Sequence, residues 1–148
     1  MGLKTHKNKL QSITHQKVLD RKSAQKKIKS HIERCDEKQD INSDNFVITK
    51  PLVLYWFHLA NKAFFNNKLP VPIFEFRRLR GTWGLCIFKN NEYVITLSLD
   101  ITSKKLLIST LLHEIVHQQQ YFTTGTMSHA ESYLKWKRYF KKNFDIVL

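Results

Sequence analysis

The sequence predicts an α+β domain built from three main helices and a small, antiparallel-type three-stranded sheet, with a basic N-terminal extension. Three observations carry this prediction. Apolar side chains recur at three- and four-residue spacing in three segments after residue 50, which is the period of an amphipathic helix. Three shorter segments alternate apolar and polar side chains, as strands do. The first aromatic side chain is Phe46, so residues 1–45 differ in composition from the rest.

Residues 1–45 are dominated by Lys, Gln, Ser, His and Asn, with isolated aliphatic side chains such as Ile28 and Ile32. Between Gln16 and Lys38 there is neither proline nor glycine, so a helix is permitted, but the apolar stripe is too thin to drive packing by itself. We therefore expect a basic extension over residues 1–45, partly helical and mobile unless bound, followed by one domain over residues 46–148.

In the domain, the first helix is expected over residues 51–65, because Pro51 suits a first turn. The strands are expected at residues 73–77, 82–88 and 93–98. Asn90 and Asn91 tolerate the positive φ of a tight hairpin between the last two strands. The second helix, from residue 102 to about 122, is apolar on much of its circumference and is therefore expected to be central.

Length and composition limit the class of protein. With 148 residues, 42% of them hydrophobic, the chain can build one packed domain. No apolar run approaches the roughly 18 residues of a membrane span, and the N-terminus lacks the apolar stretch of a secretory signal. Cys35 and Cys86 cannot form a disulfide framework or a four-cysteine zinc ribbon, and we expect Cys86 to be a small core residue. An intracellular location, cytoplasmic or nuclear, is expected.

The chain is strongly basic. It has 25 Lys and Arg residues against 12 Asp and Glu, a net charge of +13, which favours a polyanionic partner such as DNA. The predicted nucleic-acid contacts are basic residues of the third helix: Lys135, Lys137, Arg138, Lys141 and Lys142. Trp83 is expected in the core, with stacking on an unpaired base as the alternative.

The second predicted helix contains the pattern His113-Glu114-x-x-His117. Residues four apart share a helical face, so both imidazoles can bind one metal ion. Glu114 is rotated by about 100° from His113 and does not easily join the same coordination sphere. It is placed instead to take a proton from a zinc-bound water, which is the logic of zinc metallopeptidases.

A hydrolytic zinc site needs a third protein ligand. Our candidate is His129, because it lies in the first turn of the third helix, on the side of its apolar stripe, and follows a short glycine-containing turn. Glu131 is the alternative ligand, although with Ser128 it also fits a capping box at the start of that helix. Tyr133 is expected to pack in the core, with donation to a transition-state oxyanion as its other possible role.

Five segments of the chain together resemble a known family: FFNNKLP at 64–70, GTWGLC at 81–86, YVITLS at 93–98, LLHEIVH at 111–117 and SHAESY at 128–133. Their order and spacing are similar to the SprT-like metallopeptidase domain of the Spartan proteases, over residues from about 50 to 148. The resemblance implies a zincin-like fold, one zinc ion at the positions matching His113, His117 and His129, and Glu114 as general base. It also implies action on proteins attached to DNA.

The chain departs from the family pattern in two respects, and the second affects the DNA prediction. The family often has glycine after the third histidine, where this chain has Ala130, and many members carry a C-terminal zinc ribbon, whereas this chain ends at Leu148. Any DNA contact is therefore expected through the extension and the basic surface of the domain.

The sequence leads to one main functional hypothesis and one alternative. The main hypothesis is a zinc metallopeptidase that cleaves protein substrates associated with DNA, with no membrane contact, and in which the strand Tyr93–Ser98 pairs with an extended substrate. The alternative is a non-enzymatic nucleic-acid-binding protein with a structural zinc site. Because structural zinc normally has four protein ligands, three histidines beside an intact Glu114 favour the enzyme.

Overall fold

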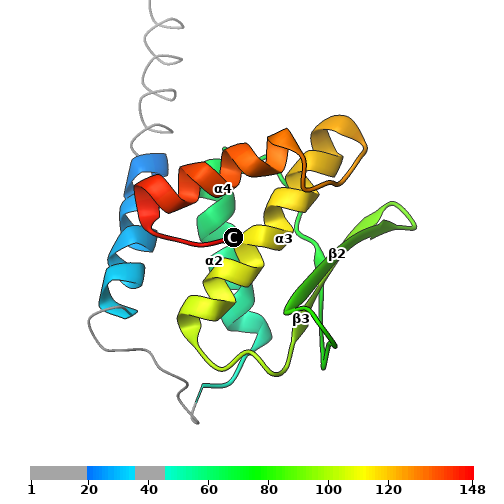
Figure 1. The fold of residues 1–148 in the computed structure, drawn as a ribbon, viewed down its shortest axis with the longest axis horizontal. Helices are drawn as coiled ribbons and strands as arrows, with labels where there is room; N and C mark the ends of the chain where they lie inside the picture. Colours follow the sequence, from blue (N-terminus) through cyan, green and yellow to red (C-terminus); the bar gives the residue numbers. More distant parts are fainter. Residues whose placement is uncertain (1–19, 36–45) are drawn as a thin grey trace, which may run out of the picture.

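The computed structural model describes residues 20–35 and 46–148, which form an α+β fold (Figure 1). Residues 20–35 are helical. The elements that follow are α2 (Lys50–Phe64), β1 (Ile73–Arg77), β2 (Gly84–Lys89), β3 (Glu92–Ser98), α3 (Lys104–Thr124) and α4 (Glu131–Phe144). No helix in this part of the chain is both long and apolar enough to cross a bilayer.

The three strands form one mixed sheet in the order β1-β3-β2. β2 and β3 are antiparallel, whereas β1 runs parallel to β3, with Ile73 opposite Val94. The prediction of a wholly antiparallel sheet was therefore wrong for β1. Alternating side chains identify a strand but not its partner. Although β2 follows β1 in the sequence, it does not pair with β1, because β3 lies between them in the sheet.

The tight turn between β2 and β3 is the one that the sequence predicted. Asn90 and Asn91 have φ values of 53° and 60°, and they join strands that end at Lys89 and begin at Glu92. Two consecutive residues with positive φ suit the right-handed twist of a two-residue hairpin.

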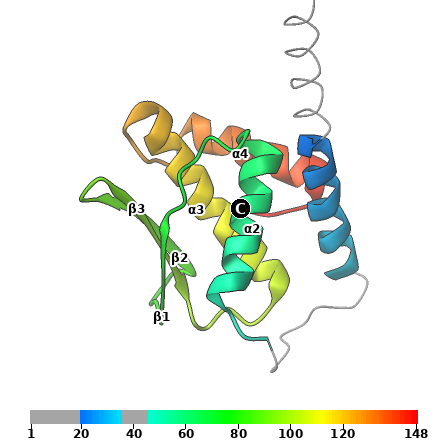
Figure 2. The same cartoon turned by 180° about the vertical axis from the view of Figure 1, so that it is seen from behind.

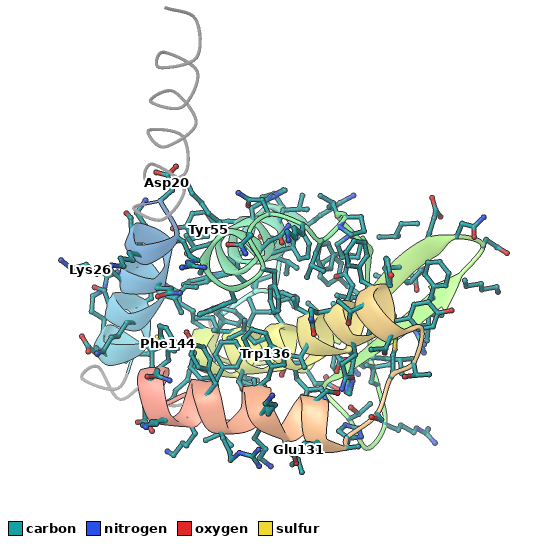
Figure 3. All side chains as sticks on the ribbon, turned by 90° about the horizontal axis from the view of Figure 1, so that it is seen from above. Asp20, Lys26, Tyr55, Glu131, Trp136 and Phe144 are labelled. Carbon is teal, nitrogen blue, oxygen red and sulfur yellow. The ribbon has the colours of Figure 1, made fainter. Side chains whose placement is uncertain are left out.

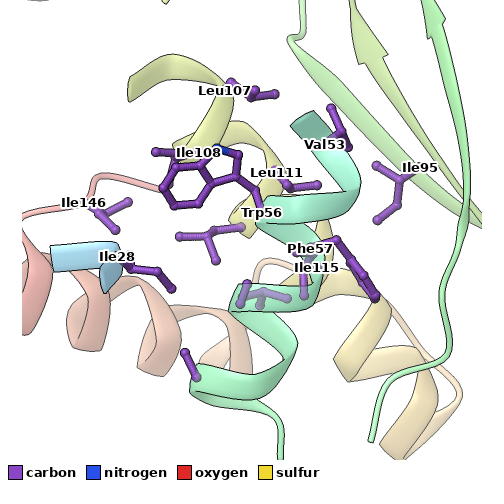
Figure 4. Packing of buried hydrophobic residues seen from close by; sticks show 14 of the residues in the cluster. Ile28, Val53, Trp56, Phe57, Ile95, Leu107, Ile108, Leu111, Ile115 and Ile146 are labelled. Atoms are coloured by element: carbon purple, nitrogen blue, oxygen red, sulfur yellow. The ribbon is translucent and has the colours of Figure 1, made fainter. Parts of the chain in front are cut away.

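The helices lie on one side of the sheet, with α3 at the centre (Figures 1 and 2). α3 packs against β2 and β3, and also against α2 and α4. Between these layers lies a continuous apolar core that includes Trp56, Ile108 and Leu111 (Figure 4). Ser103 caps the start of α3 by accepting a hydrogen bond from Leu106 N, and Gly125 ends it with φ 73°, a left-handed conformation that favours glycine.

The helix over residues 20–35 contributes to this core, unlike the thin stripe that the sequence suggested. Ala24, Ile28 and Ile32 recur every four residues and are 3%, 1% and 1% exposed. The Gln25 side chain donates to the Ala63 carbonyl oxygen at 2.8 Å, and the ring of His31 packs edge-on against Trp56. Three small or aliphatic side chains are enough to anchor this helix, because α2, α3 and C-terminal residues such as Ile146 provide the other apolar side chains of the core.

The remaining residues of the predicted extension, 1–19 and 36–45, lie outside the described residues. The predicted boundary at residue 45 and the mobility of the extension therefore stay predictions.

The predicted capping box of the third helix is absent. α4 begins at Glu131, and its N-cap residue Ala130 makes no side-chain capping bond. Ser128 lies before the helix, where its hydroxyl accepts a hydrogen bond from Ala130 N, and Glu131 forms an ion pair with Arg138 at 2.6 Å. A serine can satisfy a nearby backbone donor in a turn, and this local bond replaces the cap.

We expect Ile32→Ala to lower the free energy of unfolding by about 2–5 kcal/mol, since it removes a buried side chain from the core. Lys29→Ala, an exposed position of the same helix, should change it by less than about 0.5 kcal/mol. Urea denaturation of both variants measures the difference. Equal stability of Ile32→Ala and the unsubstituted protein would mean that this helix does not pack as described.

Candidate metal centre

Three histidines, two from α3 and one from the loop before α4, meet in one cluster. The Nε2 atom of His117 lies 3.1 Å from Nε2 of His113 and 3.3 Å from Nε2 of His129, and the third distance is 3.4 Å. Tetrahedral zinc with bonds of about 2.0–2.1 Å separates its nitrogen ligands by about 3.3 Å. The three nitrogens are therefore spaced as three corners of such a site, and this group could hold a metal ion.

The local fold explains how the three side chains meet. His113 and His117 lie one turn apart on α3, and the chain reverses at Gly125 to return His129 to them. Glu131, the alternative ligand, is not in the group. Its side chain is 71% exposed and is paired with Arg138 at the start of α4 (Figure 3).

Gln120 determines which nitrogen of His117 carries the proton. Its Oε1 accepts from Ser128 N at 3.3 Å, and since a backbone N–H only donates, the atom at this place must be the oxygen. The same oxygen is 2.8 Å from His117 Nδ1, which must therefore be the protonated nitrogen. His117 Nε2 is then left with a lone pair toward the other two histidines, as a metal ligand requires.

Gln120 is also fixed at its other end, because its Nε2 donates to Ser132 Oγ at 2.7 Å. The sequence analysis did not identify this residue. The available signal was its position three residues after His117, which places both side chains on one face of the helix.

Tyr133 contacts the first histidine. It is 4% exposed, as expected of a core residue, and its hydroxyl lies 3.0 Å from His113 Nδ1. This contact orients the ring with Nε2 toward the cluster. With His113 Nε2 toward the cluster, Nδ1 carries the proton and the Tyr133 oxygen accepts it, so the oxyanion role of the hydroxyl stays a prediction.

The electrostatics of the cluster favour neutral imidazoles. Burial, together with smaller effects of His117, His129 and Lys137, lowers the pKa of His113 to about 4. Burial also lowers the pKa of His117, partly opposed by its hydrogen bond to Gln120. Neutral imidazoles are the form that binds a metal ion, so the cluster suits a cation at neutral pH.

Glu114 is buried next to the cluster but outside it. Its side chain is 5% exposed, and burial raises its pKa to about 7. Among the described residues, no hydrogen bond to its carboxylate is found. It lies against the backbone of β2, where a Cβ added to Gly84 would be 2.9 Å from Glu114 Cγ. Only glycine at this position allows the helix and the strand to approach so closely with the carboxylate between them.

The position of β2 corrects a prediction about substrate pairing. β3, which contains Tyr93–Ser98, is the central strand and is hydrogen-bonded on both sides, so it cannot add a further strand. β2 is an edge strand beside Glu114.

Two further predictions concern residues in and just before β2. Trp83 was expected in the core, but it is 46% exposed, so that prediction was wrong. Cys86 is buried as expected, and burial raises the pKa of its thiol to about 12.

The predicted nucleic-acid contacts are all exposed on α4: Lys135, Lys137, Arg138, Lys141 and Lys142. Arg138 and Lys141 form ion pairs with Glu131 and Asp145. The exposure is compatible with a role in binding, and the role itself stays a prediction.

Comparison with known proteins agrees with this arrangement. The model of the SprT-like family matches residues 53–146, more than half of the chain, including all three strands and the histidine cluster. The Germ cell nuclear acidic protein of Drosophila melanogaster is 30% identical to this chain over 110 residues. That stretch covers 70% of this chain but only 11% of the Drosophila protein.

Replacing His129 should separate the two candidate third ligands. We expect His129→Ala to lower zinc affinity by more than about 100-fold, beyond the 10–100-fold typical of losing a hydrogen-bond partner of a ligand. Glu131→Ala removes only an exposed ion pair and should leave zinc affinity unchanged and stability within about 1 kcal/mol. Competition with a chromophoric chelator measures both affinities. The reverse order would make Glu131 the ligand.

Replacing Gln120 tests its control of His117. Gln120→Leu should weaken zinc binding by about 10–100-fold, because the Nδ1 proton of His117 loses its acceptor. Gln120→Glu keeps an oxygen at that place and should retain zinc binding within a few fold, as should Gln119→Ala on the neighbouring residue. If the Gln120→Leu and Gln120→Glu variants bind zinc with equal affinity, Gln120 does not orient His117.

Proposed function

Because the chain belongs to the SprT-like family, we propose that it is a zinc-dependent metallopeptidase that cleaves proteins associated with or cross-linked to DNA. The observation that carries the proposal is a cluster of three histidines with a buried carboxylate, Glu114, directly beside it. The donor set consists of three imidazole nitrogens at the spacing of a tetrahedral zinc site, which fits zinc.

The proposed chemistry divides between the ion and Glu114. Zinc, when bound, supplies a Lewis acid that polarises the peptide carbonyl and lowers the pKa of water. Glu114 accepts the proton of the attacking water and later donates it to the leaving amine. Its burial and its lack of a hydrogen-bond donor among the described residues support this role, since its carboxylate is left available for that proton.

The proposed protein substrate binds as an additional strand along β2. β2 has one edge paired with β3, and its other edge has no strand beside it among the described residues. Gly84 of this strand approaches Glu114, so a peptide paired with β2 would run past the carboxylate. Backbone hydrogen bonds bind extended peptides with little dependence on their sequence.

The alternative, a nucleic-acid-binding protein with a structural zinc, is less well supported. A structural zinc normally has four protein ligands. Among residues 20–35 and 46–148, the group that could hold a metal contains three histidines and no fourth His, Cys, Asp or Glu. The open fourth position supports a hydrolytic site.

The DNA part of the proposal rests on charge. The net charge is +13, and the basic residues of α4 are exposed. Sequence-independent contact with phosphates is the interaction that such a surface favours. The Drosophila relative is described by its name as a nuclear protein, and we propose an intracellular location, nuclear or cytoplasmic, for this chain as well.

Glu114→Gln should abolish peptide hydrolysis while zinc binding is retained, because the amide keeps the shape of the side chain and cannot accept the proton. Loss of general-base catalysis predicts a fall in kcat of about 100-fold or more. Zinc content by metal analysis and cleavage of a DNA-bound protein substrate measure the two effects. Glu131→Gln removes a carboxylate from an exposed position and serves as the matched control, with unchanged cleavage expected.

Hydrolysis at an unchanged rate in Glu114→Gln would contradict the general-base role. Zinc binding without hydrolysis in the unsubstituted protein, with and without DNA, would favour the structural-zinc alternative.

A further inference from the structure

A hollow of about 870 Å³ lies beside α3, between the helix of residues 20–35, the end of α2 and α4. None of the three histidines lines it. Its walls carry three cationic side chains, Arg21, Lys135 and Arg138, and three aromatic rings, those of Phe64, Trp136 and Tyr139. In Figure 3, Trp136 lies between α4 and α3. The volume is within the range of small-molecule sites.

The charge of the hollow is one-sided. No Asp or Glu lines it. Arg138 is paired with Glu131, but neither Arg21 nor Lys135 forms an ion pair with a carboxylate of the described residues. Arg21 has only a long contact, from Nη1 to Asn66 Oδ1 at 3.4 Å. Two cations from different helices therefore face one hollow with no anion between them, which favours an anionic ligand.

The aromatic side chains form an ordered surface beside these cations. Trp136 stacks on the buried ring of Phe140 with centroids 5.6 Å apart and an interplanar angle of 24°. Tyr139 is perpendicular to Trp136 and also contacts Phe64. Because Phe140 holds one face of Trp136 and the neighbouring rings fix its orientation, little side-chain entropy is lost when a planar ligand stacks there.

We propose that this hollow binds one unpaired nucleotide of a single-stranded nucleic acid. The base stacks on Trp136 with Tyr139 edge-on beside it, and the flanking phosphates bind Arg21 and Lys135. A nucleotide combines a planar base with an anionic phosphate, so it can use both the aromatic rings and the cations of the hollow. The inference rests on the nucleic-acid contact in the proposed function and not on the peptidase chemistry, because none of the three histidines lines the hollow, although Gln120, which supports His117, does.

The first experiment compares small ligands with the zinc-loaded full chain. AMP and ribose 5-phosphate carry the same phosphate, and only AMP carries a base. Isothermal titration calorimetry should give an affinity for AMP about fivefold or more above that for ribose 5-phosphate, the smallest effect expected of one stacked base. Equal affinities would show that only phosphate is bound and would overturn the proposal.

The second experiment uses fluorescence anisotropy with a labelled oligothymidine of about 12 nucleotides. Arg21→Gln combined with Lys135→Gln should weaken its binding by at least tenfold more than the control pair Lys50→Gln and Lys89→Gln. The control removes the same charge from exposed positions outside the hollow. If both pairs of substitutions weaken oligonucleotide binding equally, only the overall positive charge matters and the hollow is not a specific site, which would overturn the proposal.

Trp136→Leu and Trp83→Leu separate the two accessible tryptophans. Binding of the oligonucleotide should fall about fivefold or more for Trp136→Leu and stay unchanged for Trp83→Leu. If Trp136→Leu does not fold, as judged by circular dichroism, the AMP comparison still decides. Tighter binding of AMP than of the oligonucleotide would assign the hollow to a free nucleotide and contradict the strand assignment. Loss of peptidase activity alone would leave all these measurements unaffected.

Discussion

The close approach of α3 to β2 at Gly84 is the contact on which the rest of the site depends. A side chain at position 84 would meet Glu114 and Thr110 at 2.9 Å, so a glycine is what lets the helix lie against the edge strand. With this approach, one turn of α3 presents His113 and His117 on one face and buries Glu114 on the next. The strand edge, the carboxylate and the metal-binding nitrogens therefore occupy one region of the fold.

Gln120 joins the helix to the loop that delivers the third histidine. It accepts from Ser128 N and from His117 Nδ1, and it donates to Ser132. One buried amide thus satisfies polar groups on α3, on the loop and on α4. Because it is 2% exposed, water does not compete for these bonds. The orientation of His117 and the path of the loop to His129 are consequently set by the same side chain.

The helix over residues 20–35 links the basic N-terminal segment to the domain. Its buried stripe contacts the core, and Arg21 on its exposed side faces α4 across the hollow. Gln120 and Ser132 line that hollow as well as supporting His117, so the hollow and the metal centre share one hydrogen bond. Folding thus brings Arg21 to the same hollow as Lys135 and Arg138, which lie more than 100 residues later in the sequence.

The sequence by itself determined the features that depend on local spacing: the helices, the strands, the Asn90-Asn91 turn, and His113 with Glu114 and His117 on successive faces of one helix. These follow from backbone periodicity and from residues that favour particular φ values. Tertiary structure alone decided that β1 is parallel to β3, that Ile28 and Ile32 are buried, that Trp83 is exposed, and that His129 rather than Glu131 reaches the other two histidines. Strand partners, burial and convergence of distant residues depend on contacts between elements, and a period of two or of 3.6 residues carries no information about which element lies opposite.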